Sequence, residues 1–142
     1  MIFMISTEDI AEDVYRILKD STVHGMISGG IGYFRYDYTK EDIIIVPHTM
    51  VGSSSVRHGQ ININIHVPDE KMIINSKETY VPKFQRLKAL KKEVATILKK
   101  HYDGNTGYSW TVEAMDPAIK EQNHNEHFMC VKLELVVRKK EV

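Results

Sequence analysis

A strict alternation of apolar and polar residues runs from Gln60 to Pro68. The residues on one side of this stretch are β-branched: Ile61, Ile63, Ile65 and Val67. The residues on the other side are polar: Gln60, Asn62, Asn64 and His66. A period of two fits an extended strand and does not fit a helix. The sequence therefore predicts a strand whose isoleucine side faces the core.

The polar side of this strand carries no formal charge, which is unusual because solvated strand faces more often use Lys, Glu or Thr. Asparagine is also a poor strand residue. Amide groups both donate and accept hydrogen bonds, so they can pair with another chain or face water. Two interpretations remain open: an ordinary solvent-facing side, or a subunit contact or lumen wall formed by Gln60, Asn62, Asn64 and His66.

Two segments have helical periodicity. The first begins after Ser6, which has capping-box spacing to Asp9, and its apolar stripe is Ile10, Val14, Ile17 and Leu18. The second begins near Pro82 and ends near Gly104, and its stripe is Phe84, Leu87, Leu90, Val94, Ile97 and Leu98. Each stripe predicts a helix that packs on a sheet.

Further strands are predicted by alternation and by flanking turn residues. Residues 31–38 and 42–46 are expected to form a hairpin, and 108–114 and 128–138 are the last two strands. Residues 72–74 predict a short edge strand or an arm, and 117–122 a single helical turn. The fold class is thus α+β: one domain over residues 1–142, with a mainly antiparallel or mixed β-sheet and two amphipathic helices on one face, in the order α-β-β-β-α-β-β.

Composition narrows the function classes. The chain has 142 residues, with 19 basic and 19 acidic side chains and a formal charge of zero. Neutrality argues against a dedicated nucleic-acid binder, which would need a basic surface. The single cysteine, Cys130, excludes an internal disulfide and a cysteine-based zinc site. The apolar start is too short for a signal sequence, and no stretch is long enough to span a membrane.

Residues 48–59 predict a mobile loop, because glycine and serine are frequent there. Its hydroxyl and basic side chains are Ser53, Ser54, Ser55, Arg57 and His58. The serines lack the Gly-x-Ser-x-Gly elbow of a catalytic nucleophile. We expect a loop that orders against a partner rather than a catalytic one.

Catalytic and ligand-binding motifs are weak elsewhere. The glycines at 29, 30 and 32 lack the Gly-Lys-Ser/Thr of a phosphate loop. His124, Glu126 and His127 could share a helical face as metal ligands, but the segment leads into a strand. The sequence therefore predicts no catalytic residue, no cofactor and no metal.

Opposite charges lie on the two helices. The first helix presents Glu12 and Asp13, and the second presents Lys88, Lys91 and Lys92. Such faces are complementary when two copies of a chain meet head to tail. A charge-paired contact between subunits is therefore one expectation.

The order of these elements resembles that of a known family. The resemblance rests on five elements: the capped first helix, the strand Glu41–Val46, the long loop, the strand ending His-Val-Pro-Asp at Asp69, and the late basic helix. Together they resemble the tail-terminator or tail-completion proteins of long-tailed bacteriophages, which are often carried in prophages. The family has no catalytic sequence motif, so the resemblance assigns a function to no individual residue of this chain.

This resemblance implies a structural, non-enzymatic virion assembly protein. Its partners would be copies of itself in a ring, commonly a hexamer, together with the tail tube protein and the head–tail connector. DNA would be passing cargo, and no membrane or cofactor would be involved. The protein would reside in the bacterial cytoplasm during assembly and then in the virion tail.

Two other classes stay open. The first is a small non-catalytic binding or adaptor domain. The second is a His-based hydrolase or metal-binding enzyme that uses His66, His124 and His127. That enzyme would require the three histidines to converge in a pocket.

Overall fold

The computed structural model describes residues 5–35, 37–53, 55–103 and 107–138. The helices in these residues are α1 (Thr7–Lys19), α2 (Thr22–Met26) and α3 (Phe84–Ile97). The strands are β1 (Ile31–Gly32), β2 (Asp42–Pro47), β3 (Val51–Gly52), β4 (Val56–Pro68), β5 (Glu70–Ile74), β6 (Lys77–Val81), β7 (Lys100–Asp103), β8 (Tyr108–Met115), β9 (Ile119–Lys120) and β10 (Glu126–Arg138). None of the described helices is both long and apolar enough to cross a membrane.

The main sheet is built around two long antiparallel strands. Its order is β1-β2-β4-β10-β8-β7, with β3 also paired to β4 and β9 to β10. β4 and β10 are 13 residues each and pair along their whole length, from Pro68 with Glu126 to Val56 with Arg138. The pairing of β1 with β2 is parallel, so the sheet is mixed. The predicted α+β class is confirmed.

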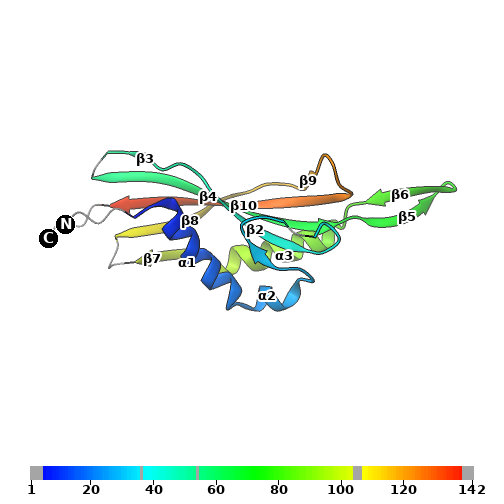
Figure 1. Cartoon of the computed structure of the whole chain (residues 1–142), viewed down its shortest axis with the longest axis horizontal. Helices are drawn as coiled ribbons and strands as arrows, with labels where there is room; N and C mark the ends of the chain where they lie inside the picture. Colours follow the sequence, from blue (N-terminus) through cyan, green and yellow to red (C-terminus); the bar gives the residue numbers. More distant parts are fainter. Residues whose placement is uncertain (1–4, 36, 54, 104–106, 139–142) are drawn as a thin grey trace.

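Helices α1 and α3 cover one face of this sheet (Figure 1). Ile61, Ile63 and Ile65 have no exposed surface, and Leu87 and Val94 of α3 pack against them in one core. The isoleucine side of β4 therefore faces the helices as predicted. The capping box between Ser6 and Asp9 is also present at the start of α1.

The predicted hairpin of residues 31–38 with 42–46 is wrong. The first strand ends at Gly32, and it runs parallel to β2, with Ile31 opposite Ile43. The following residues leave the sheet because Arg35 makes buried ion pairs with carboxylates of other strands. The helical turn predicted for 117–122 is also wrong, because β9 pairs there with β10.

Half of the loop predicted for residues 48–59 is β structure. β3 pairs with β4 through Val51 opposite His58 and Gly52 opposite Arg57. Gly52 has a φ of 137°, which an L-residue with a side chain rarely adopts. The glycine that suggested flexibility is thus required by a tight turn. Ser54 lies outside the described residues.

Strands β5 and β6 form an arm, a separate two-stranded sheet that extends beyond the end of the main sheet (Figure 1). Its turn residues Asn75 and Ser76 have φ values of 50° and 63°, as in a type I′ hairpin turn. All five residues of β5 are exposed, and Ile73 is 76% exposed. The edge strand or arm predicted at residues 72–74 is therefore an arm.

Candidate functional site

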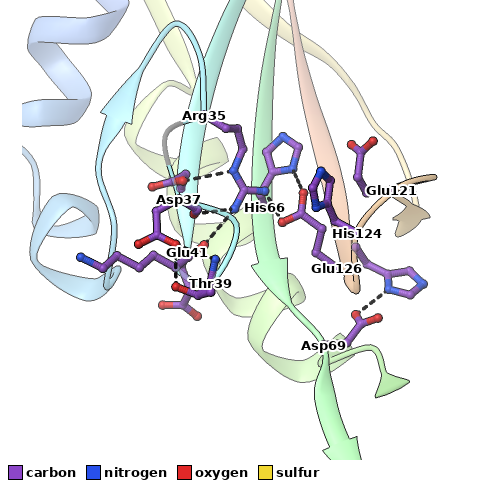
Figure 2. A network of polar contacts seen from close by, with 12 residues as sticks. Arg35, Asp37, Thr39, Glu41, His66, Asp69, Glu121, His124 and Glu126 are labelled. Carbon is purple, nitrogen blue, oxygen red and sulfur yellow. Dashed lines mark hydrogen bonds and ion pairs between the residues drawn. The ribbon is translucent and has the colours of Figure 1, made fainter. Parts of the chain in front are cut away.

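A buried network of charged side chains lies at the end of the main sheet nearest the arm (Figure 2). The Nε atom of Arg35 lies 3.1 Å from Oδ2 of Asp42, and its Nη1 contacts Oε2 of Glu126. The side chains of Arg35, Asp42 and Glu126 are only 7%, 10% and 0% exposed. One guanidinium therefore joins the first residues of β2 and β10.

The loop between β1 and β2 holds Arg35 in place. Nη2 of Arg35 donates to the carbonyl oxygens of Lys40 at 3.0 Å and Asp37 at 3.2 Å. The guanidinium also lies 4.7 Å from the centroid of the Tyr38 ring, a cation–π distance. The loop thus wraps around the cation that the two carboxylates neutralise.

Glycine is needed where this loop meets Asp42. The N–H of Gly30 donates to Oδ1 of Asp42 at 2.8 Å, and the N–H of Gly29 donates to the carbonyl of Glu41 at 2.8 Å. A Cβ at Gly29 would overlap with both Asp42 and Glu41. Within the glycine cluster that raised the question of phosphate binding, Gly29 is therefore the residue that permits close packing of the loop on β2.

His66 completes the network on β4. Its Nδ1 lies 3.1 Å from Oε1 of Glu126, and its ring stacks on Phe128 with 4.9 Å between centroids. The side chain is 8% exposed. His66 is thus buried by its own chain, with the Glu126 carboxylate and the Phe128 ring against it, and its predicted part in a subunit or lumen surface stays a prediction.

The environment of Glu126 shifts its pKa. Burial alone would raise the pKa of Glu126, but hydrogen bonds from His66 and Arg35 and the positive charge of Arg35 outweigh it, so the net shift is downward. A carboxylate whose pKa is lower in the folded state stabilises the fold above its unfolded pKa, which for glutamate is about 4.3. That contribution is lost as the pH falls through the folded pKa.

A pH series of the wild type and the Glu126→Gln variant measures this contribution. We expect the wild type to be the more stable protein at pH 7, and the gap in free energy of unfolding to narrow steadily below about pH 4.3. Urea denaturation at each pH, followed by circular dichroism, provides the measurement. A gap that stays constant down to pH 2 would contradict the assignment.

The hairpin of β9 and β10 brings Glu121 and His124 to the network. The N–H of Glu121 donates to the carbonyl of Glu126 at 3.1 Å, so the two glutamates face each other across the hairpin. His124 stacks on Tyr38 of the Arg35 loop, with 3.5 Å between ring centroids. One ligand atom of each of His66, Glu121 and Glu126 lies within 4.8 Å of the others.

His127 lies elsewhere, because consecutive strand residues point to opposite faces of the sheet. Its Nδ1 is 2.7 Å from Oδ1 of Asp69, at the root of the arm. Oδ2 of Asp69 is buried, and no described residue hydrogen-bonds to it. The three histidines considered for an enzyme thus have three different partners: Glu126, Tyr38 and Asp69.

The other predicted surface residues are distributed over the far part of the sheet. Gln60, Asn62 and Asn64 are half-buried on the face away from the helices, and Gln60 Nε2 donates to Asn62 Oδ1 at 2.6 Å. Arg57 is half-buried and donates to the carbonyl of Ile5 at 2.9 Å, while His58 is exposed. Ser53 and Ser55 are exposed, and the hydroxyl of Ser53 bonds the backbone of its own turn.

The charged helix faces are not paired with each other within the described part of the chain. Glu12 is exposed, whereas Asp13 accepts from Tyr108 and Arg16. Lys88 and Lys92 are exposed and Lys91 is half-buried. Contact between these faces in neighbouring copies therefore stays a prediction, with Asp13 already partly engaged.

Cys130 is a buried residue of β10 in the main sheet. Burial and the nearby Asp116 carboxylate raise the pKa of its thiol to about 11. At neutral pH the sulfur therefore keeps its proton and is a poor nucleophile and metal ligand.

Sequence reasoning missed Arg35, Asp42 and Glu121 as site residues. Arg35 and Asp42 each have a signal in the sequence, as does Glu126, whereas Glu121 has none. Arg35 interrupts an aromatic run, Asp42 precedes four apolar residues of a buried strand, and Glu126 begins another. A charge at the edge of an apolar segment has to be paired when the segment is buried.

The chain matches no family model, and no curated protein is significantly similar to it in sequence.

Proposed function

We propose that the protein is a structural assembly protein of the phage tail-terminator type, which associates with copies of itself through its arm. In this proposal the copies form a closed ring that caps a tail tube and contacts the head–tail connector. The observation that carries the proposal is the arm formed by β5 and β6. The family and the ring come from the resemblance in element order.

The arm has more apolar surface than an isolated hairpin can bury. Ile73 is 76% exposed, and Met72, Ile74 and Tyr80 are 43–45% exposed. Ile73 and Met72 point to opposite sides of the arm, because they are consecutive in a strand. A two-stranded hairpin is only marginally stable in water. A partner that covers both sides would remove this surface from water and stabilise the arm.

The position of the arm favours contact between different surfaces of two copies. The arm projects from one end of the elongated main sheet, and the β3–β4 hairpin lies at the opposite end (Figure 1). A projecting element that binds elsewhere on its neighbour makes a heterologous contact, and heterologous contacts generate rings when the rotation closes.

The buried network fits a structural role better than a catalytic one. Both carboxylates that contact Arg35 are at most 10% exposed, and a substrate would have to displace the loop to reach them. The adaptor alternative uses the same arm with a different stoichiometry, such as a dimer or a one-to-one complex. Solution mass distinguishes the two.

We expect Ile73→Asp to abolish association while leaving the monomer folded. A charge on the exposed arm would have to be desolvated in the contact but not in the monomer. Multi-angle light scattering over a concentration series, and electron microscopy with purified tail tubes, provide the measurement. The matched control is Ile119→Asp, which places the same charge on another exposed isoleucine (42% exposed) outside the arm.

The wild type and the control should give the same ring-sized mass or capped tubes, and the arm variant neither. The melting temperatures of all three should agree within a few degrees. A wild type that is monomeric and leaves tubes uncapped would contradict the assembly proposal. If the wild type and the Ile73→Asp variant assemble equally, only the role of the arm is contradicted, and the assembly proposal stands.

A further inference from the structure

Two glutamates face each other across the β9–β10 hairpin, although their like charges repel each other. Glu121 and Glu126 are joined by a backbone hydrogen bond of 3.1 Å. Like charges placed opposite each other in a hairpin destabilise it. Oε2 of Glu126 is neutralised by Arg35, but no described residue donates a hydrogen bond to the Glu121 carboxylate (Figure 2).

We propose that His66, Glu121 and Glu126 bind a divalent transition-metal ion of the zinc class. One ligand atom from each residue lies within 4.8 Å of the other two. Glu126 has no exposed surface, His66 is nearly buried and Glu121 is half-buried. The ion would enter from the side of Glu121 and keep a position for water there.

The donor set selects the class of ion. One imidazole nitrogen and two carboxylate oxygens suit Zn²⁺ and its neighbours in the first transition series. Ca²⁺ and Mg²⁺ prefer oxygen ligands alone, and more of them. Because no thiolate takes part, the site does not depend on Cys130.

The separation of one ligand pair is close to that in a coordinated ion. Ligand atoms about 2.0–2.2 Å from a tetrahedral metal lie roughly 3.3–3.6 Å from each other. Nδ1 of His66 and Oε1 of Glu126 are 3.1 Å apart, so this pair needs to open by only a few tenths of an ångström. Glu121 is the residue that moves, and its partly exposed side chain has free torsions to do so.

The surroundings of Glu126 support coordination through one oxygen. Arg35 contacts Oε2, which leaves Oε1 for the ion. Ligand carboxylates in metal sites are commonly held by such an outer hydrogen bond. Asp42, Glu121 and Glu126 carry three negative charges against the one of Arg35, an excess that a divalent cation balances when His66 is neutral.

Lys120 adds a nearby positive charge that the ion must tolerate. Its Nζ donates to the backbone carbonyl of Glu121 at 3.1 Å and to that of His124. The Lys120 ammonium is therefore bound to backbone carbonyls of the hairpin turn and not to the Glu121 carboxylate. An ion on the three ligands would join β4, β10 and the segment after β9, and so fasten the hairpin over the sheet.

The full-length chain, stripped with a chelator and dialysed, is titrated with ZnCl₂ by calorimetry. We expect one equivalent to bind and the melting temperature to rise with Zn²⁺ concentration, because the ion binds only the folded state. Co²⁺ in place of Zn²⁺ should give visible absorption bands of a bound ion. Binding by Ca²⁺ in preference to Zn²⁺ would overturn the assignment.

Glu121→Gln is the informative variant, because Glu121 lies outside the ion pairs of Arg35 and its loss leaves them intact. We expect its Zn²⁺ affinity to fall by at least about tenfold. Glu113→Gln, an exposed glutamate on β8, is the control and should bind as the wild type does. In the absence of metal, the wild type and both variants must have the same circular dichroism spectrum and the same melting temperature.

Absence of saturable Zn²⁺ binding to the wild type would overturn the proposal. Equal binding by the wild type and Glu121→Gln would overturn it as well, and would place any bound ion on surface histidines. Neither result bears on the arm, because the ligands lie on the main sheet and the readout requires no assembly.

Discussion

Replacing Arg35 with methionine is expected to lower the free energy of unfolding by about 3–5 kcal/mol. The methionine keeps much of the side-chain volume but leaves Asp42 and Glu126 without their cation. Both carboxylates stay buried, and an unpaired buried charge is costly because water cannot solvate it. Two loop carbonyls, of Asp37 and Lys40, lose their donor as well.

Urea denaturation at pH 7 measures this loss, and Arg16→Met is the matched control. Arg16 also contacts a carboxylate, Asp13, but its side chain is 65% exposed. Exposed ion pairs contribute at most about 1 kcal/mol. If the two variants lose the same amount of stability, the network around Arg35 is solvated and its central role in the fold is refuted.

The second large effect is expected at the centre of the sheet. Ile63→Ala should cost about 2–5 kcal/mol, because it removes buried methyl groups and leaves a cavity. Ile63 has no exposed surface and lies between Ile45 of β2 and Val131 of β10. Neighbours on both sides are fixed by ladder hydrogen bonds, so the cavity has little room to collapse.

Thermal and urea unfolding of Ile63→Ala should be compared with Ile73→Ala. The second substitution makes the same chemical change in a strand, but at a side chain that is 76% exposed. It should alter stability by less than about 0.5 kcal/mol. A comparable loss in the two variants would show that the arm is packed in the free monomer.

Periodicity predicted the parts of the fold that depend on a single buried face. The alternation around Ile63 and the stripe of Leu87, Leu90 and Val94 each identify one side to be covered, and the structure buries those sides together. Pattern alone could not show that β1 runs parallel to β2. The residues after Gly32 leave the sheet because Arg35 pairs with Glu126, which lies 91 positions away in the chain.

The candidate site was harder to predict for the same reason. Arg35 and Glu126 are separated by 91 positions, and His66 and Glu126 by 60. Each residue alone looks like an ordinary polar side chain near the end of an element. The prediction for His66 followed from its place in an alternating strand, which gives the face of the sheet but not what covers that face.

A similar limit applies to the loop at residues 33–41. Its aromatic residues favour a strand, yet tertiary contacts override this propensity. Glu41 at its end is bound by Arg86 of α3 through two hydrogen bonds of 2.7 and 2.9 Å. The Arg86 hydrogen bonds lower the pKa of Glu41, which keeps the Arg86–Glu41 ion pair charged at neutral pH.

The place of β10 in the sheet has a consequence during protein synthesis. This strand is made after the other strands that the structure describes, yet it lies between β4 and β8 and supplies ladder partners to both. Until the ribosome has released it, each of those strands has an unpaired edge, which is a template for wrong pairing with other nascent chains. The nascent chain is therefore most exposed to aggregation before β10 has emerged from the ribosome and paired with both strands.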